Sequence, residues 1–480
     1  MPMTRASVWQ SALLGLALLL PACTTAPVDE PAVPVMAAPA EGVRLGVLVT
    51  TLDGAPVFAK RETERFIPAS NTKMFTAAAM FHFVTGLQTP DPSIATSLHL
   101  VPGEGDAPPS LVLTGGGDPA VRDGADCVED CLRQLADAVV ARGIFQVGDI
   151  YADDTAFPHE PWGMGWSWNN LPFYFGASVS ALTVNGNALA LQVVPGSAEG
   201  EPIRAVWAAD DDLLGISNAA VTGAPGSEQT LSLARWPGAR DVRLSGSLPA
   251  DAAPRNYFLS VDDPARSAAE RLARLLTARS VTIEGVIKVR SRSDAPLMGT
   301  ELSRLTPPPL LDSIAYSVKD SDNLFAELML RHLARATGGE GAEDGLDAVN
   351  AMLDQAGISR AEVELFDGSG LSPYNRITPA AAVKFLRWTS AQPWGDAFRA
   401  TLPVGGQDGS LARRFRNTPL DGRIFAKTGA VQGVNALSGF MVAASGETLV
   451  FSVIANDRPA DAASVIPVID SLLLQIAAAN

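Results

Sequence analysis

The chain has 480 residues, of which 47% are hydrophobic and 18% are charged. A chain of this length suggests about three domains, and its apolar content is sufficient to bury large cores. The formal net charge of −16 and the isoelectric point near 4.7 argue against binding to nucleic acid and against a basic membrane-binding patch. Both of those functions need clustered positive charge.

The N-terminal residues resemble an export signal. Arg5 precedes an apolar run from Ala12 to Leu20, which small residues follow. This run is too short to remain in a bilayer as a spanning helix. We therefore expect a signal peptide over residues 1–22.

Cys23 follows this segment directly. Leu20-Pro21-Ala22-Cys23 resembles a bacterial lipobox, in which the cysteine carries a lipid and becomes the new N-terminus. We therefore predict lipidation of Cys23 and anchoring to a membrane. Proline is unusual in that box, and the alternative is cleavage without a lipid, with loss of Cys23. Residues 23–41 are rich in proline, alanine and valine, which is typical of a tether.

The first predicted structural unit is a β-hairpin that leads into a helix. Alternating residues from Val43 onward, a turn at Asp53-Gly54 and a returning segment to Ala59 predict the hairpin. Pro68 disfavours helix for the residue before it, so the helix is expected to begin near Ser70 and to run to about Val84.

Ser70 and Lys73 lie three residues apart and share one face of this helix. The positive helix end and burial both disfavour the ammonium form of Lys73, so a neutral amine becomes available as a base for the Ser70 hydroxyl. The alternative is a capping serine beside a solvated lysine, because S-x-x-K alone is common by chance.

Residues 89–300 differ in their pattern of predicted strands and helices from the sequence on either side, and they are predicted to form an insert. Two stretches show Asp-Pro, a helix, a short turn and a strand with glycine, which suggests two βα units. The expected helices and strands lie at 128–141, 146–151, 265–278 and 281–289.

A β-rich unit is expected within this insert, over residues 180–250. The alternation from Ala181 to Val194 around Asn185-Gly186 predicts a hairpin there. Three tryptophans that precede it are expected to pack between domains rather than to stack on a ligand; they are Trp162, Trp166 and Trp168.

Cys127 and Cys131 could pair in an oxidising compartment. Regular helical i, i+4 geometry holds Cβ atoms about 5–6 Å apart, which is wider than the roughly 3.8 Å of a disulfide. A bridge would therefore require a distorted helix at this point. No histidine or further cysteine lies nearby in the sequence, so we expect no metal site.

From about residue 305 the chain is predicted to be helical again, and strands return near its end. The expected helices and strands lie at 310–318, 323–336, 436–444, 448–455 and 462–478. Strands at both ends of the chain and helices between them predict one α/β domain that the insert divides.

Two polar triplets lie in this second half. Ser321-Asp322-Asn323 falls between two predicted helices, and Lys427-Thr428-Gly429 begins a candidate strand. Each triplet is weak evidence alone. In the order S-x-x-K, S-x-N, K-T-G, however, the three motifs match the penicillin-recognising serine enzymes.

The motifs predict a division of labour. Ser70 attacks a carbonyl and Lys73 takes its proton. Ser321 then relays that proton to the leaving amine, while Asn323 orients the acyl-side amide. Lys427 and Thr428 bind the C-terminal carboxylate of the substrate. The backbone N–H groups of Ser70 and Ala430 form the oxyanion hole, and the remaining substrate-binding residues are Gly429, Ala430 and Gln432.

Rival catalytic systems have little support in the sequence. There is no G-x-S-x-G elbow and no H-E-x-x-H metallopeptidase motif. His82 and His332 lie in predicted helices, where a structural role is expected.

With these motifs the chain resembles the type-4 penicillin-binding proteins, the D-alanyl-D-alanine carboxypeptidase/endopeptidase family of low molecular mass, class C. The resemblance spans about 43–457, and the long separation between S-x-x-K and S-x-N fits the family's two inserted domains better than a compact β-lactamase. Further segments that carry the resemblance are Gly117-Asp118-Pro119, Ser178 to Asn187, Asp367 to Ser372 and Gly406 to Leu411.

The resemblance implies an α/β (α+β) fold in which a penicillin-binding/β-lactamase-like transpeptidase domain is split by a large insert made of two nested smaller domains. It also implies a periplasmic serine peptidase that cleaves D-Ala-D-Ala termini and some D-Ala–diaminopimelate cross-links of peptidoglycan, that β-lactams acylate, and that needs no cofactor. The expected boundaries are 42–88 and 301–480 for the catalytic domain, 89–179 and 251–300 for the insert domain, and 180–250 for the nested domain.

Two residues of the insert are implied to reach the mouth of the site. Asp153 and Phe157 match a family segment, so the carboxylate would pair with the free ammonium of diaminopimelate and the ring would cover its methylene chain. The alternative is that Asp153 caps a turn and Phe157 belongs to a core. On either view, residues of roughly 90–300 are expected to select the substrate rather than to build the nucleophile.

The chain departs from the family at two positions, which affects the expected substrate preference. Ala430 stands where relatives commonly carry serine or threonine, and Pro373 where a basic residue is frequent. Two alternatives to a DD-peptidase remain: a serine β-lactamase or esterase with the same triplets, and a weakly active wall-binding lipoprotein.

Overall fold

The structure, a computed structural model, describes residues 40–124, 126–208, 213–297 and 299–480. The predicted signal peptide, the lipidation site at Cys23 and most of the predicted tether lie outside these residues. Within the described ranges, no helix combines the length and the apolar character that a membrane span requires.

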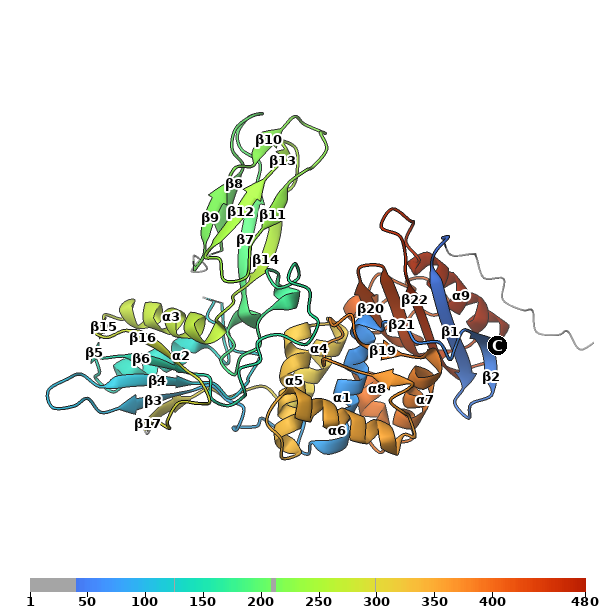
Figure 1. Cartoon of the computed structure of the whole chain (residues 1–480), viewed down its shortest axis with the longest axis horizontal. Helices are drawn as coiled ribbons and strands as arrows, with labels where there is room; N and C mark the ends of the chain where they lie inside the picture. Colours follow the sequence, from blue (N-terminus) through green and yellow to red (C-terminus); the bar gives the residue numbers. More distant parts are fainter. Residues whose placement is uncertain (1–39, 125, 209–212, 298) are drawn as a thin grey trace, which may run out of the picture. The chain divides into compact units, whose positions relative to one another are not determined.

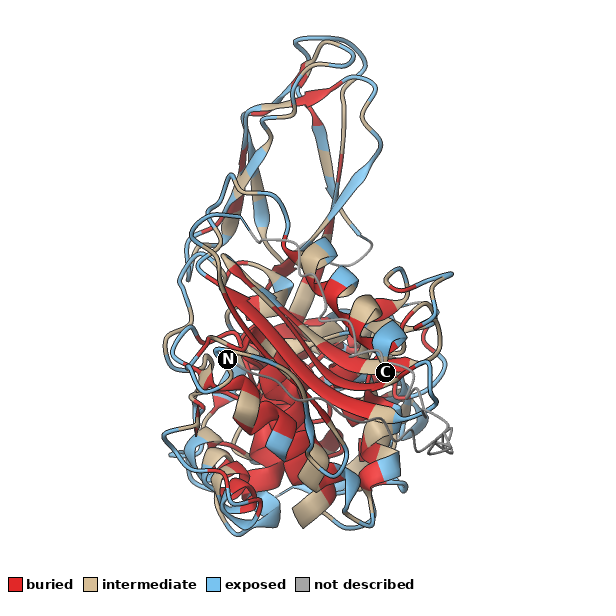
Figure 2. Ribbon diagram, turned by 90° about the vertical axis from the view of Figure 1, so that its right-hand side faces the viewer, coloured by how far each residue is buried: buried red, intermediate tan, exposed pale blue. Residues whose placement is uncertain are grey.

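A five-stranded antiparallel sheet joins the two ends of the described chain (Figure 1). Its order is β2-β1-β22-β21-β20, so the N-terminal hairpin pairs with strands from the far end of the sequence, as the pattern predicted. The central strands of this sheet are buried (Figure 2). Val450 and Ile454 belong to one core, and Phe451 and Val453 belong to the other. The strands are β1 (Arg44–Thr51), β2 (Pro56–Lys60), β20 (Ile424–Val431), β21 (Val434–Val442) and β22 (Thr448–Asn456).

Helices cover the two faces of this sheet. One core is shared with α9 (Ile466–Ala479), and the other with a group of helices around α1 (Thr72–Phe83), whose residues from Thr72 to Phe81 are all buried. The predicted helices near 310 and 323 are confirmed. The group consists of α1, α4 (Leu310–Lys319), α5 (Asn323–Ala336), α6 (Ala342–Gln355), α7 (Pro379–Ser390) and α8 (Gly395–Thr401).

The insert contains a second five-stranded sheet, in the order β16-β6-β4-β3-β17. Strand β6 is parallel to both β4 and β16, and α2 and α3 supply the helices of the two predicted βα units. Strand β17 pairs with β3, so it belongs to this sheet and not to the divided domain, which was expected to resume at 301. The bounds are β3 (Ser97–Val101), β4 (Ser110–Thr114), α2 (Leu132–Ala141), β6 (Ile150–Asp153), α3 (Pro264–Thr277), β16 (Ile287–Arg290) and β17 (Thr300–Arg304), with a separate parallel pair of β5 (Gln146–Val147) and β15 (Thr282–Ile283).

Short strands between the two βα units enclose a small core of their own. One sheet here pairs β7 with β14, so its strands extend beyond the predicted limit of 250. The strands are β7 (Ala188–Val194), β8 (Arg204–Trp207), β9 (Gly215–Asn218), β10 (Val221–Gly223), β11 (Ser232–Ala234), β12 (Asp241–Ser245), β13 (Ser247–Pro249) and β14 (Arg255–Ser260).

The hairpin predicted from Ala181 to Val194 is wrong. Asn185–Asn187 form a 3₁₀ turn, and only the segment after it is a strand. The Asn187 side chain bonds the Val184 N–H and the Ser178 carbonyl, which closes the turn on itself. Leu182 is buried in the core of the insert and Ala181 in a cluster that the insert shares with α5, and this burial accounts for the apolar pattern that suggested a strand.

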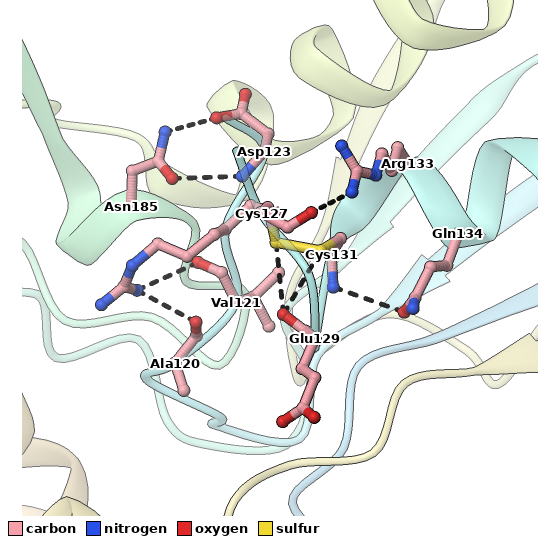
Figure 3. Close-up of a disulfide and its surroundings, with 10 residues drawn as sticks. Ala120, Val121, Asp123, Cys127, Glu129, Cys131, Arg133, Gln134 and Asn185 are labelled. Atoms are coloured by element: carbon pink, nitrogen blue, oxygen red, sulfur yellow. Dashed lines mark hydrogen bonds between the residues drawn. A yellow bond between two sulfur atoms is a disulfide. The ribbon is translucent and has the colours of Figure 1, made fainter. Parts of the chain in front are cut away.

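Cys127 and Cys131 form a disulfide, with a Cα–Cα distance of 5.9 Å (Figure 3). The helix predicted from residue 128 begins only at Leu132, with Cys131 as its N-cap in extended conformation. Both cysteines therefore precede the helix, and the helical spacing that argued against a bridge does not apply to them.

Candidate active site

Ser70 lies in a single 3₁₀ turn, η1 (Ala69–Asn71), that runs directly into α1. Ala69, just before it, has a φ of +48°, in the left-handed region that costs energy for a residue with a Cβ. Two glycines pack closely enough to hold this conformation. A Cβ at Gly370 would lie 2.0 Å from the Ala69 carbonyl oxygen, and one at Gly429 would lie 2.6 Å from that of Pro68.

Lys73 is fully buried beside Ser70. Its Nζ lies 3.2 Å from Ser70 Oγ, and it donates to Asn323 Oδ1 at 2.5 Å and to the Ser369 carbonyl at 2.7 Å. Burial lowers the pKa of Lys73 to about 8, although the negative charges of Asp322, Asp367 and Glu327 oppose this fall. The predicted neighbour pair of hydroxyl and amine therefore exists, and the neutral form of the amine is far more accessible than in an exposed lysine.

The Ser321–Asn323 triplet joins α4 to α5, and its Asn323 is the residue that bonds Lys73 Nζ. Asp322 caps α5 by accepting from the Phe325 N–H, and Ser321 has a φ of +64°. Asn323 donates its Nδ2 to the carbonyl of Phe175 in the insert, at 2.6 Å, and this bond turns its Oδ1 toward Lys73.

Lys427 is the second buried lysine, and it lies within strand β20 rather than at its start. Its Nζ donates to Ser321 Oγ at 2.8 Å. Burial lowers the pKa of Lys427 well below its usual range, and the nearby Lys73 acts in the same direction. The Asn71 side chain donates to the Lys427 carbonyl at 2.8 Å, which ties this edge strand to the nucleophile turn.

A cavity of about 540 Å³ opens over these groups. Ser70, Ser321 and Asn323 line it, together with Ala430 and Gln432 at the end of β20. Thr428 bonds the hydroxyl of Ser410 at 2.7 Å, and Gly429 packs against the nucleophile turn. Segments of the insert and of the loop after β18 (Val363–Glu364) complete the wall with Ser167, Asn169, Asn170, Tyr174, Phe175, Gly370, Leu371 and Pro373.

No histidine lines this cavity. His332 is buried and bonded to the Gly117 carbonyl at 2.9 Å, and burial lowers its pKa to about 4. His82 contacts Gln355. The expectation of structural roles for both is confirmed. In the described part of the chain, no group of three or more His, Cys, Asp or Glu side chains is arranged to hold a metal ion.

The structure contradicts the placement of Asp153 and Phe157 at the mouth of this cavity, since neither lines it. Asp153 is buried at the end of β6, where it pairs with Arg290 at 2.5 Å and accepts from the Thr155 N–H. Phe157 is buried in an apolar cluster with Leu324 and Leu328. The alternative reading, a turn-capping carboxylate and a core ring, is the correct one.

Several residues that position the site carried no assigned role in the sequence. Asn71 and Ser410 are examples. Asn71 bonds Lys427, more than 300 residues away in sequence, and Ser410 bonds Thr428, about 20 residues away. Glu327 follows Asn323 by one helical turn and is buried, as are its neighbours on α5. A carboxylate between the apolar runs 324–326 and 328–330 was the available signal, because such a charge needs a partner when it is buried.

The geometry defines a class of protein: an acyl-transfer hydrolase with a serine nucleophile, a lysine base and a second Ser–Lys pair. The model of the D-Ala-D-Ala carboxypeptidase 3 (S13) family matches residues 33–475. A D-alanyl-D-alanine carboxypeptidase of Actinomadura sp. (strain R39) is 35% identical over 432 residues, which cover 87% of this chain and 78% of the relative. The D-alanyl-D-alanine carboxypeptidase DacB of Haemophilus influenzae is 25% identical over 86% of this chain and 85% of its own.

Solved structures agree in fold. Penicillin binding protein 4 (dacB) from Haemophilus influenzae superposes with a TM-score of 0.77 at 23% identity, over 92% of this chain and 96% of that one. A second structure, complexed with a novel β-lactam, has a TM-score of 0.72 at 22% identity, over 92% and 95%. The chain belongs to the D-Ala-D-Ala carboxypeptidase 3 (S13) family. The expected fold class and the expected activity, a serine-type D-Ala-D-Ala carboxypeptidase, are confirmed.

The pKa of Lys73 predicts how the enzyme depends on pH. A base works only when it is unprotonated, so the second-order rate constant of acylation by penicillin should fall below about pH 8. The fall should be about tenfold for each pH unit, and stopped-flow labelling with a fluorescent penicillin would measure it. A rate constant that stays level through the neutral range would contradict a base of this pKa.

The buried Asp153–Arg290 pair predicts a stability defect without a catalytic one. Asp153→Ala leaves Arg290 buried without its partner and should lower the free energy of unfolding by about 3–5 kcal/mol, measured by urea denaturation. Penicillin labelling of the folded variant should remain near wild type. Asp137→Ala, which breaks the exposed pair with Arg279, is the control and should cost less than about 1 kcal/mol. Equal losses in the two variants would show that the Asp153 pair is not buried as described.

Proposed function

We propose that the protein hydrolyses the D-Ala-D-Ala termini of peptidoglycan stem peptides, and D-Ala–diaminopimelate cross-links, through an acyl-enzyme on Ser70. The observation that carries this proposal is the 3.2 Å contact between Ser70 Oγ and the buried Lys73, whose pKa burial lowers to about 8, at the wall of a cavity. This pair supplies both a nucleophile and an acceptor for its proton without histidine.

Acylation follows from the contacts of the two Ser–Lys pairs. Lys73 takes the proton as Ser70 Oγ attacks the penultimate D-Ala carbonyl. Ser321, which accepts from Lys427, lies in the same cavity wall, and we assign to it the relay of this proton from Lys73 to the departing D-Ala amine. Backbone N–H groups at Ser70 and Ala430 are the proposed oxyanion donors, a contribution of about 10²–10³ in rate for each donor. Water then attacks the ester carbonyl while the same groups transfer protons in the reverse order, which releases the shortened peptide and restores Ser70.

Recognition of the terminal carboxylate is assigned to Lys427 and to the hydroxyls of Thr428 and Ser410. A carboxylate in this position raises the pKa of Lys427 again, because it compensates the buried ammonium. Binding of substrate and protonation of Lys427 are therefore coupled. Ala430 supplies no hydroxyl to this carboxylate.

The location and the response to antibiotics belong to the same proposal. The predicted signal peptide and the Cys127–Cys131 disulfide both support an oxidising periplasm, with Cys23 as a lipid anchor. A β-lactam resembles the scissile peptide and would acylate Ser70, and the β-lactam complex of the Haemophilus influenzae protein supports this expectation. Peptidoglycan peptides and β-lactams are thus the proposed binding partners.

Ser70→Ala should abolish covalent labelling by fluorescent penicillin. Muropeptide analysis of purified sacculi should show loss of terminal D-Ala, and of cross-links, with wild type but not with the variant. Rapid turnover of penicillin with unchanged sacculi would instead indicate a β-lactamase or esterase. Sacculi that bind the protein and stay intact would indicate a wall-binding lipoprotein.

The two buried lysines should respond differently to the same substitution. Lys73→Arg should abolish acylation, because guanidinium cannot give up its proton. Lys427→Arg should retain partial activity, with the loss mainly in KM, because a cation for the carboxylate remains. Steady-state kinetics on a D-Ala-D-Ala peptide would measure both, and equal losses would refute the separate roles.

A further inference from the structure

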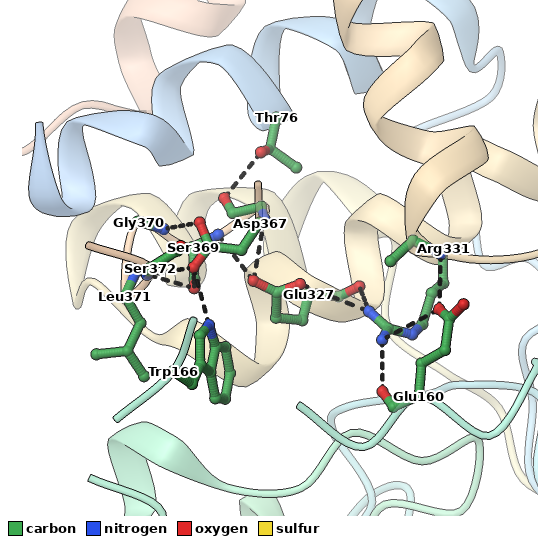
Figure 4. A network of polar contacts seen from close by, with 12 residues as sticks. Thr76, Glu160, Trp166, Glu327, Arg331, Asp367, Ser369, Gly370, Leu371 and Ser372 are labelled. Carbon is green, nitrogen blue, oxygen red and sulfur yellow. Dashed lines mark hydrogen bonds and ion pairs between the residues drawn. The ribbon is translucent and has the colours of Figure 1, made fainter. Parts of the chain in front are cut away.

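Glu327 is a buried carboxylate that the reaction described above does not use. It lies on α5, with its side chain 1% exposed, and points at the loop that carries Asp367 to Ser372 (Figure 4). The backbone N–H groups of Gly368 and Ser369 both donate to its Oε1, at 3.0 and 2.9 Å. A buried carboxylate with two such bonds fixes the two consecutive peptides that donate them.

This loop is part of the environment of the lysine base. The Ser369 carbonyl accepts from Lys73 Nζ at 2.7 Å. Glu327 holds the peptide before Ser369, and Asp367 holds the peptide after it by accepting from the Gly370 N–H at 2.8 Å. Thr76 of α1 adds a third, uncharged contact, because its hydroxyl donates a hydrogen bond to the Gly368 carbonyl at 2.8 Å.

We propose that Glu327 is a positioning residue for Lys73, which presents the Ser369 carbonyl to the amine and supplies one of the negative charges that surround it. The proposal rests on the assignment of Lys73 as the base. Glu327 acts through the loop and through its charge, without contact with the substrate.

The charge of Glu327 gives this role a pH signature. The charged groups that act on Lys73 are Asp322, Asp367 and Glu327, which raise its pKa, and Lys427, which stands nearby with the opposite sign. Burial and the neighbouring Asp367 raise the pKa of Glu327 itself to about 7, whereas Arg331 opposes this rise. Glu327 is therefore charged above about pH 7, and there it favours the ammonium form of Lys73.

The insert reaches the same network. Arg331 lies 3.5 Å from Glu327 and donates to the Glu160 carbonyl at 2.8 Å. Trp166 donates its indole N–H to Asp367 at 2.9 Å. Both Glu160 and Trp166 belong to the insert, so these contacts argue against the expectation that residues of roughly 90–300 are dispensable for building the nucleophile.

Two variants, Glu327→Gln and Thr76→Val, distinguish the effect of the Glu327 charge on Lys73 from the effect of loop position. Glutamine keeps an acceptor for the two N–H groups but loses the charge that raises the pKa of Lys73, so the acid limb of the acylation profile should shift to lower pH. The difference from wild type should be largest above about pH 7, where Glu327 is charged, and should shrink at lower pH as this carboxylate is protonated. Thr76→Val removes an uncharged bond to the same loop. It should lower the maximal acylation rate constant several-fold and leave the midpoint of the pH profile unchanged.

The double variant Glu327→Gln with Arg331→Met removes the buried cation together with its partner, and guards against misfolding of the single variant. It should show the same shift. The proposal would be overturned if the midpoint of the acylation pH profile did not move in folded Glu327 variants, or if Thr76→Val shifted it equally. If Lys73→Arg retained labelling, the assignment of the base would fail instead, and that outcome is separate from the test of Glu327.

Discussion

One nitrogen atom, Nζ of Lys73, is the point at which distant parts of the chain meet. Its partners are Ser70 on its own helix turn, Asn323 at the start of α5 and the carbonyl of Ser369 in a loop. Full burial favours loss of its proton, while three nearby carboxylates favour keeping it. The resulting pKa of about 8 leaves the amine able both to accept a proton from serine and to return it.

The surrounding fold keeps this balance in place. The edge strand β20 is tied to the nucleophile turn through Asn71, whose oxygen in turn accepts from Ser438 in the middle of the sheet at 2.6 Å. Three hydrogen bonds join the insert to this region. The Phe175 carbonyl accepts from Asn323, the Trp166 indole donates to Asp367, and the Glu160 carbonyl accepts from Arg331. Polar groups thus form a connected network in a core that is otherwise apolar, and each of these buried groups has partners that offset its desolvation.

Local chemistry in the sequence predicted much of this arrangement. The helix from Asn323 to Ala336 has Asp322 as its cap and an apolar run behind it, and three short motifs indicated which side chains meet. The errors arose where tertiary packing decides. The alternation after Ala181 reflects burial, partly in the insert and partly against α5. Asp153 forms an ion pair with Arg290, and Phe157 packs in the apolar cluster at α5. The role of Glu327 depends on a loop 41 residues away, which no local pattern encodes.

The central claim is that burial brings the pKa of Lys73 to about 8. The chain contains six lysines, Lys60, Lys73, Lys288, Lys319, Lys384 and Lys427, so protein labelled with ¹³C-lysine gives few enough Cε signals to follow individually. The Lys73 signal is identified as the one that Lys73→Arg removes, and its shift is then followed against pH in the protein without substrate. A midpoint near 8 would support the account. A midpoint near the ordinary lysine value of about 10.4 would contradict it, because the amine would then be almost entirely charged at neutral pH.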